Sequence, residues 1–177
     1  MFVIYNFFLS LIIFISPLII LIRIFLGKED KNRFKEKYGF LAKNNNSNEI
    51  VWIHGASVGE ILTIIPIIQK FEKDKKIKRI LITSSTTSSS QILSKFRFKK
   101  TIHQFYPFDL NFLTKHFINH WKPKLAIFVD SEIWPNMFNN LHKQNIPLIL
   151  LNARITKKSF NRWKFFPNFS KKIFQKI

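Results

Sequence analysis

The sequence contains no cysteine and few acidic residues. The lack of cysteine excludes disulfide bonds and thiolate metal sites, and it is compatible with a reducing compartment. Asp and Glu number 10 against 29 Lys and Arg, which gives a formal net charge of +19. This balance favours an anionic partner: nucleic acid, an acidic membrane surface or a phosphorylated substrate. Because Lys, Asn, Ile and Phe are abundant throughout, a bias of the source genome can explain part of the charge.

The first 22 residues carry no charged side chain. They are mostly Phe, Leu and Ile, and the run is about as long as a helix needs to cross a bilayer core. It shows no polar face, which a buried core helix of this length would normally have. It also lacks the basic start and the small-residue cleavage site of a signal peptide. We therefore predict an uncleaved membrane anchor within residues 1–26, which either spans the bilayer or lies in one leaflet.

A basic segment follows the anchor. Its Lys and Arg residues are Arg23, Lys28, Lys31, Arg33, Lys35 and Lys37. By the positive-inside rule they place the rest of the chain in the cytoplasm, and they would hold it against anionic lipid headgroups. The simpler interpretation is a solvated linker helix over 29–38, and both can hold together. We expect residues 27–48 to form this linker and a polar loop that ends at the domain boundary.

From residue 49 onward, short apolar runs alternate with helical patterns. The runs lie at 50–53, 79–83, 101–106, 125–129 and 147–151. This order predicts an α/β fold over residues 49–177, with a Rossmann-like parallel sheet of five strands and helices on both faces. Because right-handed crossovers place every strand-to-helix turn at one edge, the turns after the five strands should share a rim.

The stretch from His54 to Glu60 is a small-residue turn between a buried strand and a helix. In open α/β sheets ligands bind beyond the carboxyl ends of the strands, where the free N–H groups of the next helix favour an anion. The small residues keep the turn narrow, so a substrate can approach the backbone. Glu60 adds a carboxylate there, which either caps the helix or acts as a base on a substrate hydroxyl.

Four of the six acids after residue 49 follow strand ends on this rim. They are Glu60, Asp109, Asp130 and Glu132. For Asp109 we expect the simpler role of capping the helix that begins at residue 111. Glu132 stands beside a Trp-Pro turn, and an apolar wall of this kind either raises a carboxyl pKa or positions the group against a sugar. The hydroxyl run 84–90 is compatible with a low-complexity loop and equally with helix caps or bonds to phosphate and sugar.

Four motifs resemble, in order and spacing, the amino-terminal domain of the 3-deoxy-D-manno-octulosonic acid (Kdo) transferases. The motifs are His54-Gly-Ala-Ser-Val-Gly-Glu60, Tyr106-Pro-Phe-Asp109-Leu, Asp130-Ser-Glu132-Ile-Trp-Pro135 and Leu151-Asn-Ala-Arg154. The segment 27–30 after the anchor and the aromatic, basic stretch after Arg154 fit the same family. Asp130 stands where the family often has Glu, which leaves its role open. The resemblance covers nearly the whole chain.

The resemblance implies a two-domain glycosyltransferase of the GT-B type at the cytoplasmic face of the inner membrane. Such enzymes transfer Kdo from CMP-Kdo to a lipid A precursor in lipopolysaccharide synthesis, with inversion and with no metal or other cofactor. The amino-terminal half would hold the lipid acceptor and supply the base. The carboxyl-terminal donor domain would bind CMP-Kdo and is absent from this chain, so we expect the chain alone to be incomplete for turnover.

The resemblance also assigns roles to individual residues. Glu60 matches the general base, which agrees with the need for one carboxylate to take the proton from the attacking hydroxyl. Ser57 and Gly59 at the helix start would hold an anionic group nearby, and Glu132 would contact or orient the acceptor. Arg154 would pair with lipid phosphates or the donor carboxylate, or it belongs to a helix on an acidic membrane surface.

Two other functions stay open. A non-catalytic, membrane-anchored module would bind phosphorylated lipid through its basic surface, and its affinity would not depend on Glu60 or Glu132. A nucleic-acid binder is suggested by the charge and by the interleaved aromatic residues of the carboxyl-terminal stretch. The anchor and the acidic rim argue against that third function, so no nucleic-acid partner is expected.

Overall fold

The computed structural model describes residues 2–44, 49–130 and 132–177, and it contains a parallel sheet of five strands. The strands are β1 (Ile50–His54), β2 (Arg79–Ser84), β3 (Thr101–Phe105), β4 (Leu125–Val129) and β5 (Leu148–Leu151). Their order is β3-β2-β1-β4-β5, and every pairing is parallel. The predicted α/β fold is confirmed, and each strand boundary lies within one residue of its expected position. Residues 45–48, most of the predicted polar loop, lie outside the described residues.

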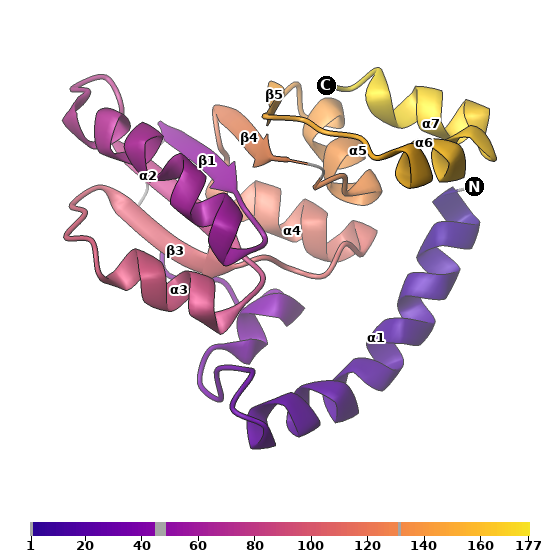
Figure 1. Ribbon diagram of the computed structural model, residues 1–177, viewed down its shortest axis with the longest axis horizontal. Helices are drawn as coiled ribbons and strands as arrows, with labels where there is room; N and C mark the ends of the chain where they lie inside the picture. The colour runs from indigo at the N-terminus through magenta and orange to yellow at the C-terminus, as the bar shows by residue number, and fades with distance from the viewer. Residues whose placement is uncertain (1, 45–48, 131) are drawn as a thin grey trace.

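Helices cover both faces of this sheet (Figure 1). The helices are α1 (Phe2–Phe25), α2 (Val58–Lys73), α3 (Thr87–Ser94), α4 (Asn111–Trp121), α5 (Pro135–Lys143), α6 (Lys157–Lys164), α7 (Pro167–Phe174) and the 3-10 helix η1 (Phe34–Tyr38). One hydrophobic cluster packs α2 and α3 against the sheet, and a second packs α4, α5 and α7 against its other face. Because β1 and β4 are covered on both sides, they read as continuous apolar runs rather than alternating ones.

The centre of the sheet is occupied by aromatic side chains of β1 and β4. Trp52 is fully buried, and its ring centroid lies 4.9 Å from that of Phe117 and 5.1 Å from that of Phe128. The indole N–H of Trp52 donates to Thr83 Oγ1 at 2.9 Å, so the buried ring leaves no polar atom without a partner. This packing holds the carboxyl ends of β1, β2 and β4 in fixed relative positions.

The hydroxyl run after β2 forms a capped helix. Thr86 is the N-cap of α3, and its hydroxyl oxygen accepts a bond from the Ser89 backbone N–H. The helix-cap alternative is therefore confirmed for this run, and residues from 87 onward are helical rather than loop.

The segment over 29–38 differs from its prediction. It is not a solvated helix, because only η1 is helical and the side chains of Glu29 and Lys37 are buried as an ion pair of 2.7 Å. Arg33 pairs with Glu36 at 2.7 Å, and the Glu36 carboxylate accepts the backbone N–H of Phe105. These ion pairs hold the segment against the edge strand β3. They also take part of the basic charge away from lipid headgroups.

Asp109 does not cap the helix that follows it, so that prediction is wrong. The N-cap of α4 is Leu110, which makes no side-chain capping bond, and Asp109 precedes the cap by one residue. Its buried carboxylate instead accepts the backbone N–H groups of Asn136 at 3.0 Å and Met137 at 2.9 Å, in the first turn of α5. Burial raises the pKa of Asp109 to about 7, although these N–H donors act in the opposite direction.

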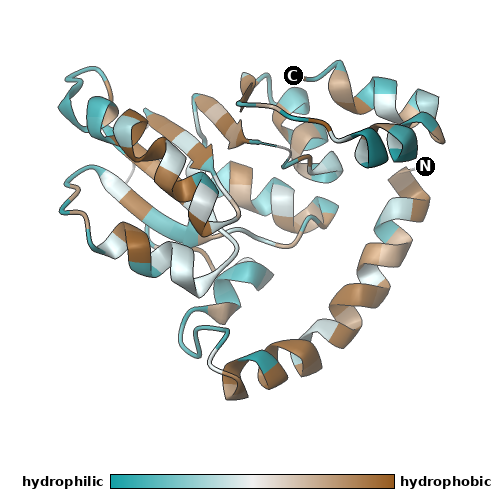
Figure 2. Cartoon of the chain, viewed as in Figure 1, coloured by the Kyte–Doolittle hydropathy of each residue, from teal (hydrophilic) through white to brown (hydrophobic). Residues whose placement is uncertain are grey.

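Helix α1 is long and apolar enough to cross a membrane, and most of its surface is exposed. It is the most continuously hydrophobic element in Figure 2. In Figure 1 its amino-terminal end lies beside α6 and α7, and the helix then curves along the sheet domain toward η1. Pro17 lies inside the helix, where a proline removes one backbone hydrogen bond and permits bending.

Candidate functional site

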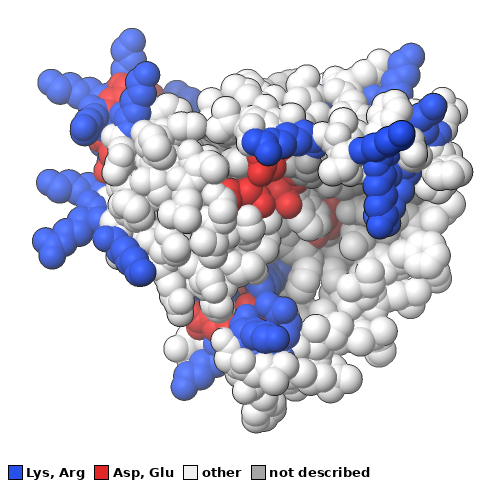
Figure 3. Space-filling view, in the orientation of Figure 1, with Lys and Arg blue, Asp and Glu red and all other residues white. Residues whose placement is uncertain are grey.

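The predicted site residues surround the point where the sheet changes direction. From β1 the chain runs to β2 and β3 on one side and then returns to β4 on the other. Open α/β sheets bind ligands at such a switch point, beyond the carboxyl ends of the strands. We call this region, between the turn after β1 and the turn after β4, the crevice. Strands β1 and β4 are direct neighbours, with His54 opposite Phe128. Figure 3 shows acidic atoms gathered in the middle of this face, with basic side chains mostly toward its margins.

Ser57 and Glu60 form a reciprocal cap at the start of α2. Ser57 is the N-cap, and its oxygen accepts the backbone N–H of Glu60 at 3.3 Å. The Glu60 carboxylate in turn accepts the Ser57 hydroxyl and the Ala56 backbone N–H, each at 2.7 Å. This is a variant of the capping box, in which Glu60 accepts the backbone N–H of the residue before the N-cap, and it satisfies free donors at a helix start. The capping role expected as one alternative for Glu60 is therefore observed, and it fixes the direction of the carboxylate.

The two glycines of this turn have different surroundings. A Cβ atom at Gly55 would lie 3.3 Å from Glu60 Cβ and 3.3 Å from Ile61 Cδ1, which is tighter than ordinary packing. A Cβ atom at Gly59 would meet only Ser57 Oγ, at 3.9 Å. Gly55 therefore lets the start of α2 fold back close to β1, whereas Gly59 leaves open space at the crevice.

Glu132 accepts one hydrogen bond and lies close to a buried imidazole from another element. Its Oε2 accepts the indole N–H of Trp134 at 2.9 Å and lies 3.6 Å from His54 Nε2 at the end of β1. Burial alone would raise the pKa of Glu132, but the contact with His54 and the bond from Trp134 lower it below its usual value. The expectation of a raised pKa is wrong, because the nearby His54 and the indole N–H of Trp134 together outweigh the effect of burial. The other alternative, that Glu132 is positioned against a sugar, stays open.

His54 lies at the site next to Glu132, and the sequence analysis gave it no role of its own. It is fully buried, and its Nδ1 lies 2.9 Å from Thr83 Oγ1. Because Thr83 already accepts the indole N–H of Trp52, its own proton is available for His54 Nδ1. This pattern assigns the imidazole proton to Nε2, where it faces Glu132. Hydrogen bonds thus link Trp52, Thr83 and His54, and His54 Nε2 faces Glu132 at 3.6 Å. The sequence signal for His54 was its place at the end of a buried strand, as the first residue of the motif over 54–60.

The ends of β4 and β5 carry a matched pair of residues. Asp130 and Asn152 each follow their strand directly, and both have φ of 56°, in the left-handed region that Asp and Asn tolerate. The Asn152 amide donates to Asp130 Oδ1 at 2.6 Å, and Arg154 Nη2 lies 3.5 Å from Asn152 Oδ1. These contacts bring Arg154 to the same edge as Asp130.

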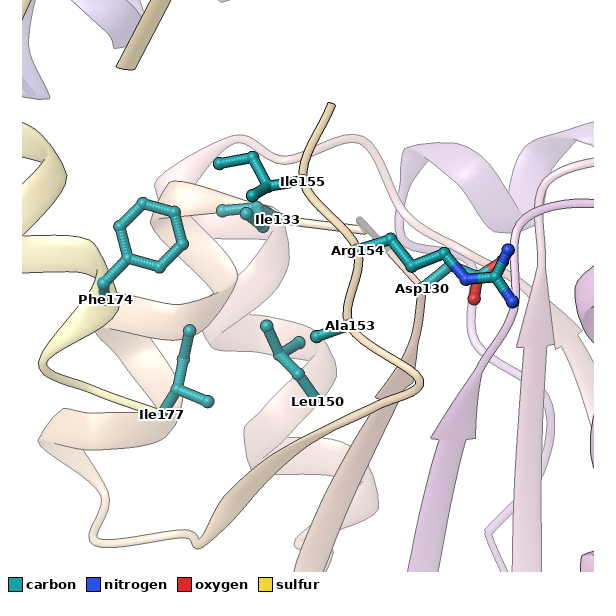
Figure 4. A pocket seen from close by; sticks show the side chains of 8 residues that line it. All are labelled: Asp130, Ile133, Leu150, Ala153, Arg154, Ile155, Phe174 and Ile177. Atoms are coloured by element: carbon teal, nitrogen blue, oxygen red, sulfur yellow. The ribbon is translucent and has the colours of Figure 1, made fainter. Parts of the chain in front are cut away.

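A pocket of about 450 Å³ opens beside this pair. Its lining is Asp130, Ile133, Leu150, Ala153, Arg154, Ile155, Phe174 and Ile177. Figure 4 shows Arg154 extending away from the apolar side chains and toward Asp130. The pocket therefore has an apolar body and a charged mouth, which suits an amphiphilic ligand.

The structure brings most of the predicted site together. Ser57, Gly59 and Glu60 lie on the turn after β1 or at the start of α2. Glu132 contacts His54, at the end of the same strand. Arg154 contacts Asn152, at the end of β5. Asp109 is only 2% exposed and serves α5, so it is not open to a ligand. In the described parts of the chain, no group of three or more His, Asp or Glu is placed to hold a metal ion.

The comparisons with known proteins agree on one family. Residues 32–177 match the family described as 3-deoxy-D-manno-octulosonic-acid transferase (kdotransferase). The chain is 41% identical over 160 residues to the 3-deoxy-D-manno-octulosonic acid transferase of Rickettsia bellii, across 90% of this chain and 38% of that one. It is 31% identical over 161 residues to the enzyme of the same name from Haemophilus influenzae, across 89% and 38%.

A plant relative extends the comparison. The chain is 34% identical over 163 residues to the probable mitochondrial 3-deoxy-D-manno-octulosonic acid transferase of Arabidopsis thaliana, across 90% of this chain and 36% of that one. The chain thus spans less than two fifths of the length of these three relatives. With its α/β fold, its motifs in register and its match to the family model over residues 32–177, this chain belongs to the 3-deoxy-D-manno-octulosonic acid transferase family.

Proposed function

We propose that this chain is the acceptor-binding half of an enzyme that transfers Kdo from CMP-Kdo to a lipid A precursor. In this proposal residues 1–26 attach the chain to the cytoplasmic face of the inner membrane, and residues 27–48 link this anchor to the sheet domain. Residues 49–177 bind the acceptor, while CMP-Kdo binds mainly to a second domain. The observation that carries the proposal is the Glu60 carboxylate, fixed in direction at the switch-point crevice by Ala56 and Ser57. The names of the relatives support the reaction.

Glu60 is proposed as the general base. Inverting transfer needs a carboxylate that takes the proton from the attacking acceptor hydroxyl. Each Glu60 oxygen accepts one bond from the turn, and an ionised carboxylate has about four lone-pair sites, so each oxygen keeps capacity for a substrate hydroxyl. The capping bonds do not compete with this role, because they hold the group rigid before the acceptor arrives.

Glu132 and Arg154 are proposed to orient the acceptor. The lowered pKa of Glu132 keeps it ionised at neutral pH, so it can accept bonds from sugar hydroxyls. Arg154 carries the positive charge expected for a lipid phosphate or the donor carboxylate. The start of α2 at Ser57 and Gly59 adds backbone N–H groups that favour an anion.

The test of the base is Glu60→Gln in the complete enzyme, with CMP-Kdo and a phosphorylated lipid A precursor. Loss of the base should lower the transfer rate by about 10²–10⁴-fold while lipid binding is retained. Glu49→Gln is the matched control, because Glu49 lies before β1 and pairs with Lys124 on the surface. Transfer at the normal rate by the Glu60 variant would rule out Glu60 as the base.

The acceptor site can be tested on this chain in detergent. Arg154→Ala should weaken binding of the phosphorylated precursor by roughly 10-fold or more, as expected for loss of a charged hydrogen bond. Glu132→Ala should weaken it as well. Binding that ignores both changes would favour the non-catalytic module that holds phosphorylated lipid through its general basic charge.

A further inference from the structure

Helix α1 presents one stripe to the protein and a different surface to its surroundings. The less exposed positions recur every three or four residues and include Tyr5, Leu9, Ile13, Ser16, Ile20 and Arg23. This spacing is one face of a helix. The stripe contains polar groups, so the helix does have a polar side, and that side is turned toward the protein. Large apolar residues such as Val3, Phe14 and Phe25 are 82%, 86% and 87% exposed.

Polar contacts fasten α1 to the sheet domain near its start. Tyr5 donates from its hydroxyl to the buried Asp109 carboxylate at 2.8 Å. Asn6 and Asn136 exchange amide bonds of 2.8 and 3.3 Å. Asp109 and Asn136 belong to the carboxyl edge of the sheet and the first turn of α5, so this end of the helix lies against the same edge as the crevice.

The other end of α1 is fastened as well. Ser16 and Tyr38 share a hydroxyl bond of 2.7 Å, and Arg23 pairs with Glu29 at 3.2 Å. From Arg23 to Tyr5 a helix rises about 27 Å. A helix that spanned the bilayer would carry Tyr5 to the opposite surface, away from Asp109. The contacts at both ends therefore require α1 to run along the domain.

A second surface continues the exposed side of α1. The ring of Phe169 in α7 packs on Phe2 at 5.1 Å, so α6 and α7 adjoin the start of α1 (Figure 1). Phe160 in α6 and Phe165 and Phe166 directly after it are 49%, 78% and 52% exposed, and α6 also carries basic residues. Figure 3 shows basic side chains standing out at this end of the molecule. Exposed aromatic rings among cations are typical of surfaces at the lipid headgroup level.

We propose that α1 lies in the plane of the membrane as an in-plane anchor, with its apolar side in one leaflet and α6 and α7 against the headgroups. The proposal rests on the membrane attachment in the proposed function and specifies its geometry. The exposed side of α1 is about 36 Å long and almost wholly apolar, and positive charge lies beside it on α6. A lipid bilayer fits such a surface, because anionic headgroups match the positive charge. It follows that the crevice edge faces the membrane, so a lipid acceptor can reach it without leaving the leaflet.

The absence of cysteine makes the test direct, because each introduced cysteine is unique. Val3→Cys, Phe14→Cys and Phe25→Cys lie on nearly one side of α1, eleven residues apart, and replace highly exposed side chains. A nitroxide attached to each, in the full chain bound to phosphatidylethanolamine and phosphatidylglycerol vesicles, reports depth by its accessibility to oxygen and to a water-soluble nickel complex. The in-plane anchor predicts that all three positions lie inside the hydrocarbon and are shielded from the nickel complex.

Other patterns would overturn the proposal. A deep Phe14 position between two ends that are open to the nickel complex means a spanning helix. Three positions open to the nickel complex in the bound protein mean that the face meets water or another protein instead of lipid. The measurement uses no Kdo substrate, so a failure of the transferase proposal would leave its outcome unchanged.

A cross-linking measurement in the same vesicles checks the contact with α7. Phe2→Cys with Phe169→Cys should be joined by a short bis-maleimide within one chain, because the native rings touch. The matched control, Phe14→Cys with Phe169→Cys, places the first cysteine about 18 Å further along the helix and should not be joined. Failure of the first pair in the membrane would contradict the in-plane arrangement.

Discussion

The sheet and helix α1 are built from the same apolar residues and use them in opposite ways. In the sheet, runs of four to six residues are bounded by turns, and helices cover both of its faces. In α1 the run is 24 residues long, and large side chains such as Phe14 remain exposed. The difference lies in where the polar groups point: at the ends of the strands they form the crevice, and on α1 they face the protein. The direction of the few polar side chains therefore indicates whether an element is buried or exposed better than its content of apolar residues does.

The largest expected effect separates the two regions by stability. Trp52→Ala should lower the free energy of unfolding by roughly 3–5 kcal/mol, because it empties a fully buried site at the centre of the sheet. Phe14→Ala, on the exposed side of α1, should change it by less than about 0.5 kcal/mol. Urea denaturation in detergent, followed by circular dichroism, measures both. Equal losses would mean that α1 belongs to the folded core.

The next prediction tests whether the basic segment belongs with the sheet. His103 in β3 accepts from Arg33 at Nδ1 and bonds Ser84 through Nε2, and burial, with the Arg33 charge, lowers its pKa from 6.5 to about 3. Because the folded pKa of His103 lies below its unfolded value, neutral His103 stabilises the folded state. This stabilisation is complete above pH 6.5 and is lost as the pH falls toward 3. Between pH 7 and pH 4 the loss should be roughly 2–3 kcal/mol.

The control for that pH dependence is His103→Gln, which keeps a polar side chain and cannot gain the proton. Its unfolding free energy should fall less steeply over the same interval, whatever its value at pH 7. Parallel curves for the two proteins would show that His103 is already protonated or exposed in the folded state.

A smaller effect is expected where the two regions meet, at Asp109. Asp109→Asn replaces an acceptor oxygen by an amide NH2, so at least one of its three donors, from Tyr5, Asn136 and Met137, loses its acceptor. The expected cost is about 1–3 kcal/mol in unfolding free energy. Tyr5→Phe removes only the bond to α1 and should cost less. If the two variants lose the same stability, the capping of α5 contributes little.

The sequence predicted the sheet well because short apolar runs between turns are local signals. It placed Glu60, Glu132 and Arg154 at the crevice for a related reason, since parallel strands end at one edge. It failed for Asp109, whose target helix begins 26 residues later, and for His54, whose partners come from β2 and the turn after β4. Those contacts depend on how distant segments pack, which no local pattern records.

Inside the crevice, the contact of His54 with Glu132 should appear as a shift in ionisation. His54→Gln removes the imidazole that helps to keep the pKa of Glu132 below its usual value, so that pKa should rise. Carboxyl carbon resonances of labelled Glu, assigned with Glu132→Gln, measure the change, and those of Glu49 should stay constant. An unmoved Glu132 would leave Trp134 as the residue that sets its ionisation. Dispersed amide signals of the sheet would show that the variant is folded.

The smallest effect concerns the two glycines of the turn after β1. This turn, like the outer side of α1, lies at the border between the folded core and its surroundings. Gly59→Ala should keep the fold and raise the unfolding free energy by roughly 0.5–1 kcal/mol, because alanine favours the first turn of α2 and meets only Ser57 Oγ at 3.9 Å. Gly55→Ala should lower it, because its Cβ would press on Glu60 and Ile61 at 3.3 Å. If a ligand approaches the backbone at Gly59, the stabilised variant will nevertheless bind the phosphorylated lipid more weakly. Unchanged binding would place the acceptor away from this turn and nearer to Arg154.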